Sequence, residues 1–146
     1  MEFIDLGLPS KTLWANENKG FYLVDDAISK FGNNLPSEHD FQELFDNCKM
    51  TWDKEKEGYT LTGPNGNTLF LPCTGIDNCG ARTRRGLKHI MGNYATSTST
   101  DEKVTLVWFK SDQVKPFCIS RNRKQLNHEL DEIYKDEYGI RLCKKP

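Results

Sequence analysis

The chain has 146 residues, 36% of them hydrophobic and 11% aromatic, a size that predicts one compact domain over residues 1–146 with its own buried core. Its 20 basic and 21 acidic residues give a net charge of −1, which excludes a protein that binds polyanions through its overall charge. Five scattered cysteines are too few, and odd in number, for a disulfide scaffold, so we expect mostly reduced thiols, several of them buried.

The first residues and the hydropathy of the chain bear on its location. Met1 is followed by Glu2 and Asp5 rather than by a basic and then apolar leader. No apolar stretch approaches the roughly 20 residues needed to cross a bilayer. We therefore expect neither a signal peptide nor a membrane span, and favour a virion or cytoplasmic location over secretion.

The first third of the chain predicts one strand and two helices. Residues 3–8 alternate apolar and polar side chains, as a strand does. Residues 24–31 place apolar side chains at helical spacing, and Gly32 can end that helix. A second helix begins after Ser37, where Asp40 three residues later completes a variant of the capping box.

The segment GYTLTGPNGNTLFLP, residues 58–72, predicts a β-hairpin. Two runs that alternate apolar and polar residues flank Asn65-Gly66, a pair typical of tight hairpin turns. One face of this hairpin is apolar and must be covered by the rest of the chain, because an isolated hairpin is marginally stable.

The second half of the chain is less regular. Residues 74–103 lack apolar periodicity and predict a long surface excursion. Residues 104–109, VTLVWF, are apolar on both faces and predict a central buried strand, whose hairpin partner is residues 117–119. Residues 125–136 have helical spacing in an acidic segment, and residues 138–143 predict a last strand.

Six segments between Ile4 and Leu142 carry a family resemblance: IDLGLPSKTLWA, SEHDFQELFDNC, GYTLTGPNGNTLFLP with Trp52 before it, GNYATST, LVWF and YGIRL. In this order they resemble the Fibrobacter succinogenes major paralogous domain (FISUMP) family of gut and related bacteria. The resemblance implies an α+β, C-type-lectin-like fold, with a small antiparallel sheet, two to three helices and a long loop region. It also implies that the N-terminal and C-terminal strands pair.

Two structural expectations follow. The strand with Ile4 and Leu6 should pair with the strand that directs Ile140 and Leu142 inward, since both alternate and the resemblance implies their pairing. One buried core should hold the apolar residues of several elements, namely Phe41, Phe45, Leu71, Leu106 and Trp108.

Metal and catalytic motifs are weak. The spacing of Cys73 and Cys79, with His89 nearby, is wider than that of zinc-binding pairs. The three histidines lie in separate regions without a nucleophile at motif spacing. The loop from Asn78 to Thr100 has no carboxylate, which argues against a calcium site. We therefore expect no metal, no cofactor and no enzymatic activity.

Two windows without acidic residues, 78–100 and 113–128, together hold eight positive charges. If both lie at one end of the fold, that end attracts an acidic partner. The alternative is that these are solvated loop residues that pair with the acidic segment 129–137. The candidate ligand-binding residues are Arg82, Arg84, Arg85, Lys88, Tyr94, Arg121, Arg123 and Lys124.

The leading functional hypothesis is a non-catalytic binding or adhesion module that contacts a protein or a glycan through its long loop region. It would serve as a component of a phage virion or a bacterial surface. The alternative is an intracellular regulatory or inhibitory protein that binds nucleic acid, or an enzyme acting on nucleic acid, through a basic face.

Overall fold

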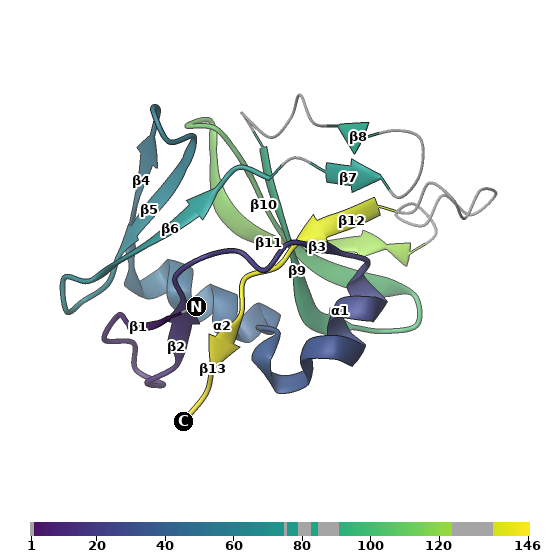
Figure 1. The fold of residues 1–146 in the computed structure, drawn as a ribbon, viewed down its shortest axis with the longest axis horizontal. Helices are drawn as coiled ribbons and strands as arrows, with labels where there is room; N and C mark the ends of the chain where they lie inside the picture. The colour runs from purple at the N-terminus through teal and green to yellow at the C-terminus, as the bar shows by residue number, and fades with distance from the viewer. Residues whose placement is uncertain (1, 75, 79–82, 85–90, 124–135) are drawn as a thin grey trace.

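The computed structural model describes residues 2–74, 76–78, 83–84, 91–123 and 136–146. Within these ranges the chain has the expected α+β architecture, with two α-helices packed against mostly antiparallel sheets (Figure 1). In chain order the elements are β1 (Phe3–Asp5), β2 (Leu13–Ala15), β3 (Phe21–Tyr22), α1 (Val24–Phe31), the short 3-10 helix η1 (Gly32–Asn34), α2 (Glu38–Asn47), β4 (Lys49–Asp53), β5 (Gly58–Thr62), β6 (Thr68–Pro72), β7 (Ile76–Asn78), β8 (Thr83–Arg84), β9 (Met91–Ser99), β10 (Lys103–Lys110), β11 (Val114–Asn122), β12 (Asp136–Gly139) and β13 (Cys143–Lys144).

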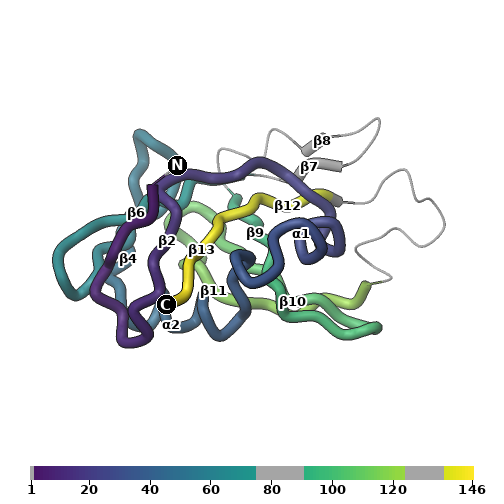
Figure 2. The backbone as a smooth tube through the Cα atoms, turned by 60° about the horizontal axis from the view of Figure 1, so that its bottom comes forward, coloured from purple at the N-terminus to yellow at the C-terminus, as the bar shows by residue number. Residues whose placement is uncertain are grey.

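The first and last strands share a small sheet, but they do not pair with each other. The strand order is β1-β2-β13, so β2 lies between them and pairs with both (Figure 2). The predicted direct pairing is therefore wrong, because the apolar segment around Trp14 forms a strand of its own. The predicted last strand is also split: the chain leaves the large sheet after Gly139 and enters the small sheet at Cys143.

The large sheet has the strand order β11-β10-β9-β12-β7-β8, and β3 pairs with β12 beside it. The predicted hairpin of residues 104–109 with residues 117–119 is confirmed as the β10–β11 pair. The surface excursion predicted for residues 74–103 is wrong in part, because β9 is an interior strand of this sheet. Gly92 of β9 lies against the ring of Phe109, where a Cβ atom would overlap ring atoms.

The predicted hairpin of residues 58–72 is confirmed as β5 and β6. Tyr59, Leu61, Leu69 and Leu71 form its buried face, as the alternation indicated. The neighbouring strand β4, which extends this unit to the order β4-β5-β6, was not predicted.

Both N-terminal helices are confirmed. Helix α1 ends at Gly32, whose positive φ of 52° suits glycine. Helix α2 begins with the full capping box: Ser37 Oγ accepts from Asp40 N at 3.1 Å, and Asp40 Oδ2 accepts from Ser37 N at 2.9 Å. The third helix predicted at residues 125–136 lies outside the described residues apart from Asp136, where β12 begins.

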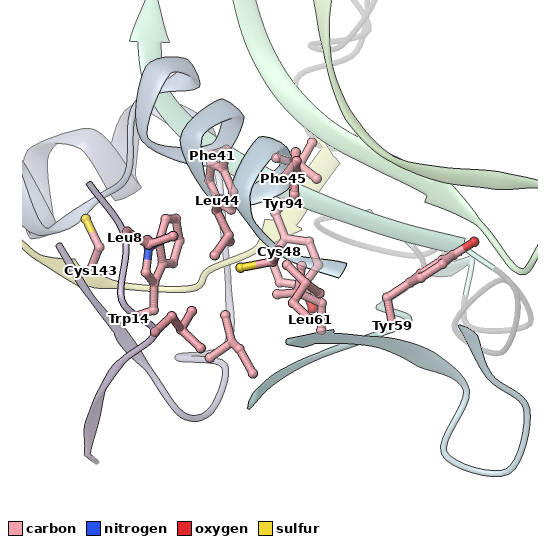
Figure 3. Close-up of a cluster of buried hydrophobic side chains, with 14 of the residues drawn as sticks. Leu8, Trp14, Phe41, Leu44, Phe45, Cys48, Tyr59, Leu61, Tyr94 and Cys143 are labelled. Atoms are coloured by element: carbon pink, nitrogen blue, oxygen red, sulfur yellow. The ribbon is translucent and has the colours of Figure 1, made fainter. Parts of the chain in front are cut away.

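The core consists of two clusters on opposite faces of the large sheet, because successive residues of β10 point to opposite sides. Val107 and Phe109 belong to the cluster under α2, which also contains Phe41 and Leu61 (Figure 3). Leu106 belongs to the cluster under α1. The single core predicted for five residues is therefore wrong for two of them: Leu106 lies on the other face, and Trp108 belongs to neither cluster and is only half-buried.

Candidate binding surface

The basic residues predicted as a shared patch are not brought together by the described part of the chain. Arg84 is in β8 and Arg121 is in β11, at opposite edges of the large sheet in its strand order. Arg121 is exposed. Four more of the predicted basic residues lie outside the described ranges: Arg82, Arg85, Lys88 and Lys124.

Arg123 makes contacts within the protein. Its Nη1 donates to both carboxylate oxygens of Asp25 in α1, at 3.0 and 2.8 Å. Its Nε donates to the carbonyl oxygen of Thr100 at 2.7 Å. Arg123 therefore joins the end of β11 to α1 and to the β9–β10 turn. Its ion-pair partner among the described residues is Asp25 of the first helix, whereas most of the acidic segment 129–137, which the sequence offered as an alternative, lies outside the described ranges.

Tyr94 is fully buried, so its predicted contact with a ligand is not possible in this structure. Its hydroxyl donates to the carbonyl oxygen of Pro72 at 2.7 Å and accepts from Asn18 Nδ2 at 3.0 Å. Burial raises the pKa of Tyr94 to about 12. The sequence placed Tyr94 in a loop, whereas β9 carries it into the core beside Phe109.

Arg141 is a second buried polar residue of the same network, and sequence reasoning did not identify it. It is 1% exposed, and desolvation by burial lowers the pKa of its guanidinium group. Its Nε donates to Asn18 Oδ1 at 2.8 Å, and its two terminal nitrogens donate to the carbonyl oxygens of Ala15 and Phe70. These contacts hold together β2, β6 and the segment between β12 and β13, so Arg141 has a structural role.

Three side chains form a row across β9, β10 and β11, which we call the aromatic row: Asn93, Trp108 and Phe117. Trp108 pairs directly with Asn93 on one side and with Phe117 on the other, so the three side chains lie on one face of the sheet. The Trp108 and Phe117 ring centroids are 5.8 Å apart, and the rings are nearly perpendicular, at 83°. Phe117 is 38% exposed, which is high for a large apolar side chain.

The next row on the same face explains why the aromatic row is open. That row consists of Ala95, Leu106 and Ile119, which pack in the cluster that includes the buried face of α1. Trp108 and Phe117 lie one row farther toward the β10–β11 turn and belong to neither core cluster. The aromatic row therefore lies outside the core cluster that includes the buried face of α1.

Asn93 is the member of the aromatic row that lies on the interior strand β9. It is 5% exposed, and its Nδ2 is a buried donor without a hydrogen-bond partner, as is Trp14 Nε1 in the described part of the core. Its backbone is held firmly: Asn93 N donates to Thr74 Oγ1 at 2.9 Å, and Thr74 Oγ1 donates to Asn93 O at 3.3 Å. An unmade hydrogen bond of this kind costs about 1–3 kcal/mol.

Charged residues of both signs border the aromatic row. Lys110 follows Trp108 by two positions and is partly buried, while Lys115 precedes Phe117 by two positions and is exposed. Asp112 lies in the turn between them and is exposed. The surface thus has an apolar centre with a rim of mixed charge.

Thiol and metal chemistry have no support among the residues that the structure describes. Burial raises the pKa of the Cys73 and Cys118 thiols to about 12, with smaller contributions from Glu57 and Glu38 respectively, so neither is a nucleophile at neutral pH. Four cysteines are free thiols, and Cys79 lies outside the described residues. No group of three potential metal-binding side chains occurs in the described ranges.

Comparisons with known proteins found no match for this chain among family models, curated proteins or solved structures. A search of the described residues also found no helix that is both long and apolar enough to span a membrane.

The aromatic row was hidden in the sequence for a specific reason. The run VTLVWF is almost entirely apolar. Its pattern therefore does not reveal that Trp108 lies outside the core cluster that contains Leu106 and the buried face of α1. A signal was present in β11, where Lys115, Phe117 and Arg121 occupy alternate positions of the kind that share one face. Charged neighbours at this spacing indicate that Phe117 is on the outer side of its strand.

Proposed function

We propose that this chain is a non-catalytic binding module that contacts a protein or a glycan through the aromatic row. The observation that carries the proposal is the exposed Phe117 beside the half-buried Trp108, outside the core cluster that includes α1. Aromatic side chains at the surface of a rigid sheet supply large contact areas at low cost in side-chain entropy.

The proposed setting is adhesion, as part of a phage virion or a bacterial surface. It rests on the resemblance to the FISUMP family and its C-type-lectin-like fold. Two features support that fold: the first and last strands share one sheet, and the two predicted N-terminal helices flank the large sheet. The strand β2 between the terminal strands is a departure from the expected pairing.

The alternative of an intracellular regulator that binds nucleic acid through a basic face has less support. Among the predicted basic residues that the structure describes, Arg84 and Arg121 are at opposite sheet edges, and Arg123 is paired with Asp25. Nucleic-acid binding requires several cations along one surface, because phosphate contacts supply most of the affinity.

The test is binding of the labelled full-length chain to intact bacterial cells and to an array of defined glycans. The chain offers a matched control, because Phe21 is 37% exposed and Phe117 is 38% exposed. We expect Phe117→Ala to lose binding and Phe21→Ala to retain it. Equal binding of the wild type and Phe117→Ala to every target would contradict the proposal.

A further inference from the structure

We infer that the partner of the aromatic row is a protein with an acidic surface around an apolar recess, and that Phe117 is the anchor of the contact. This inference rests on the proposed function and narrows its ligand class. It depends on two observations: the angle between the two rings and the charges on the rim.

The ring geometry favours a protein over a base or a sugar. Trp108 and Phe117 meet edge to face, at 83°, so the two rings cannot both lie flat against ligands stacked on the sheet. Single-stranded nucleic acid is bound by successive aromatic platforms whose faces are available to bases. An exposed Phe117 supported from the side by Trp108 instead has the form of an anchor residue that enters an apolar pocket.

The rim charges favour the same conclusion. Lys115 and Arg121 are exposed on β11, and Lys110 lies beside the row. Exposed acids lie at both ends of the β10–β11 hairpin: Asp112 in its turn, and Glu102 next to the start of β10. Mixed signs around an apolar centre are typical of protein–protein interfaces, whereas a nucleic-acid site is uniformly basic.

A second copy of the chain fits less well than an acidic partner. An isologous contact places the same patch against itself, and near the row the cations Lys110, Lys115 and Arg121 outnumber the exposed acid Asp112, so two copies complement each other less well than an acidic surface does. Pro116 in β11 also lacks the N–H needed for continuous pairing of two edge strands. An acidic partner removes both difficulties, because it complements Lys115 and Arg121 and packs on the face rather than along the edge.

The class of partner is tested by photo-crosslinking. p-Benzoyl-phenylalanine replaces Phe117 in the full chain within cells that normally produce it, and a second strain carries it in place of Phe21. We expect a discrete adduct from position 117 alone, destroyed by protease and resistant to nuclease and glycosidase. The adduct protein is then purified, and its affinity is measured for the wild type, Phe117→Ala and Lys115→Glu.

With the purified partner, Phe117→Ala should weaken binding about tenfold or more, as an anchor residue does. Lys115→Glu should weaken it less, and that difference should shrink as salt increases, since exposed charges are screened. A protein captured at position 117 whose affinity is unchanged by Phe117→Ala would overturn the inference.

The remaining outcomes distinguish the acidic protein partner from the proposed binding function on which it rests. A nuclease-sensitive adduct, a glycosidase-sensitive adduct or a dimer of the chain at position 117 overturns the acidic protein partner. A glycan adduct still agrees with the proposed binding module, whose ligand is a protein or a glycan. No adduct at position 117, or equal adducts at positions 117 and 21, overturns both.

Discussion

Arg141 Nη2 donates a hydrogen bond of 2.7 Å to the carbonyl oxygen of Phe70, a residue 71 positions earlier in the chain. The same guanidinium group bonds to Asn18 Oδ1 and to the carbonyl oxygen of Ala15. One buried cation thereby holds together segments that no local sequence signal connects. The network extends through Asn18 to Tyr94, the residue first assigned to a ligand site.

Replacing Arg141 with methionine should destabilise the protein strongly. Arg141→Met keeps much of the side-chain length but leaves one buried and two partly buried acceptors without their donor, and hydrogen bonds to charged groups contribute about 1.5–3 kcal/mol each. We expect the free energy of unfolding in urea to fall by at least about 3 kcal/mol. The exposed Arg121→Met is the control and should change it by about 0.5 kcal/mol or less. Equal urea midpoints for Arg141→Met and Arg121→Met would show that Arg141 does not stabilise the core.

Gly92 and Phe109 should show strong energetic coupling. A Cβ atom at position 92 would overlap the ring of Phe109, so Gly92→Ala should destabilise the wild type by about 1–3 kcal/mol. In a Phe109→Leu background the smaller side chain leaves space, and the added cost of Gly92→Ala should be much lower. The four proteins are compared by urea denaturation. Purely additive effects would show that β9 does not pack against Phe109 as described.

Trp108 should matter less for stability than its neighbour. Phe109 is fully buried in the cluster under α2, so Phe109→Ala should cost about 3–5 kcal/mol. Trp108 is half-buried outside both clusters, and Trp108→Ala should cost less than half as much. Thermal and urea unfolding measure both values. A larger loss for Trp108→Ala would place it in the core, as the sequence first indicated.

The capping box of α2 makes a pH-dependent contribution to stability. Burial alone would raise the pKa of Asp40, but hydrogen bonds from Ser37 and Lys145 outweigh this effect and hold it below its usual value. Because the folded pKa is lower than the unfolded one, the stabilisation is present above about pH 4 and is lost as pH falls through the folded pKa. Wild type should therefore exceed Asp40→Asn in unfolding free energy at pH 7, with a difference that disappears toward pH 2. A difference in unfolding free energy between the wild type and Asp40→Asn that does not vary with pH would contradict stabilisation by the ionised Asp40 carboxylate.

The partly buried thiols of Cys73 and Cys118 should resist alkylation until the protein unfolds. Burial raises the pKa of Cys73 and Cys118 to about 12, compared with about 8.5 for an exposed thiol. In a Cys79→Ser background at pH 8, the reaction of these two thiols with iodoacetamide should be much slower in the native protein than in urea. Mass spectrometry locates the labelled residue. Rapid labelling of native Cys73 would show that its thiol is accessible and ionised.

Local signals predicted the parts of the fold that local interactions determine. The hairpin of residues 58–72 and the start of α2 were predicted because Asn65-Gly66 and the Ser37–Asp40 capping box act within a few residues. Strand β9 was not predicted, because Gly92, Asn93 and Thr96 give it little apolar alternation, although both of its edges are paired in the sheet.

The candidate surface was less predictable because it depends on tertiary packing. Trp108 and Leu106 look alike in the sequence, but Leu106 belongs to the core cluster that includes α1, whereas Trp108 is half-buried outside it. Charge counting also failed to show that Arg123 is already paired with Asp25, 98 positions earlier. Both distinctions arise from contacts between distant segments.

The most direct measurement is the ratio of two dissociation constants for the purified partner, one for Phe117→Ala and one for Phe21→Ala. The two phenylalanines are almost equally exposed, at 38% and 37%, so general hydrophobicity affects both variants alike. Melting temperatures confirm that both variants fold. If the aromatic row is the binding surface, Phe117→Ala should bind about tenfold or more weakly than Phe21→Ala. A ratio near one would contradict that claim.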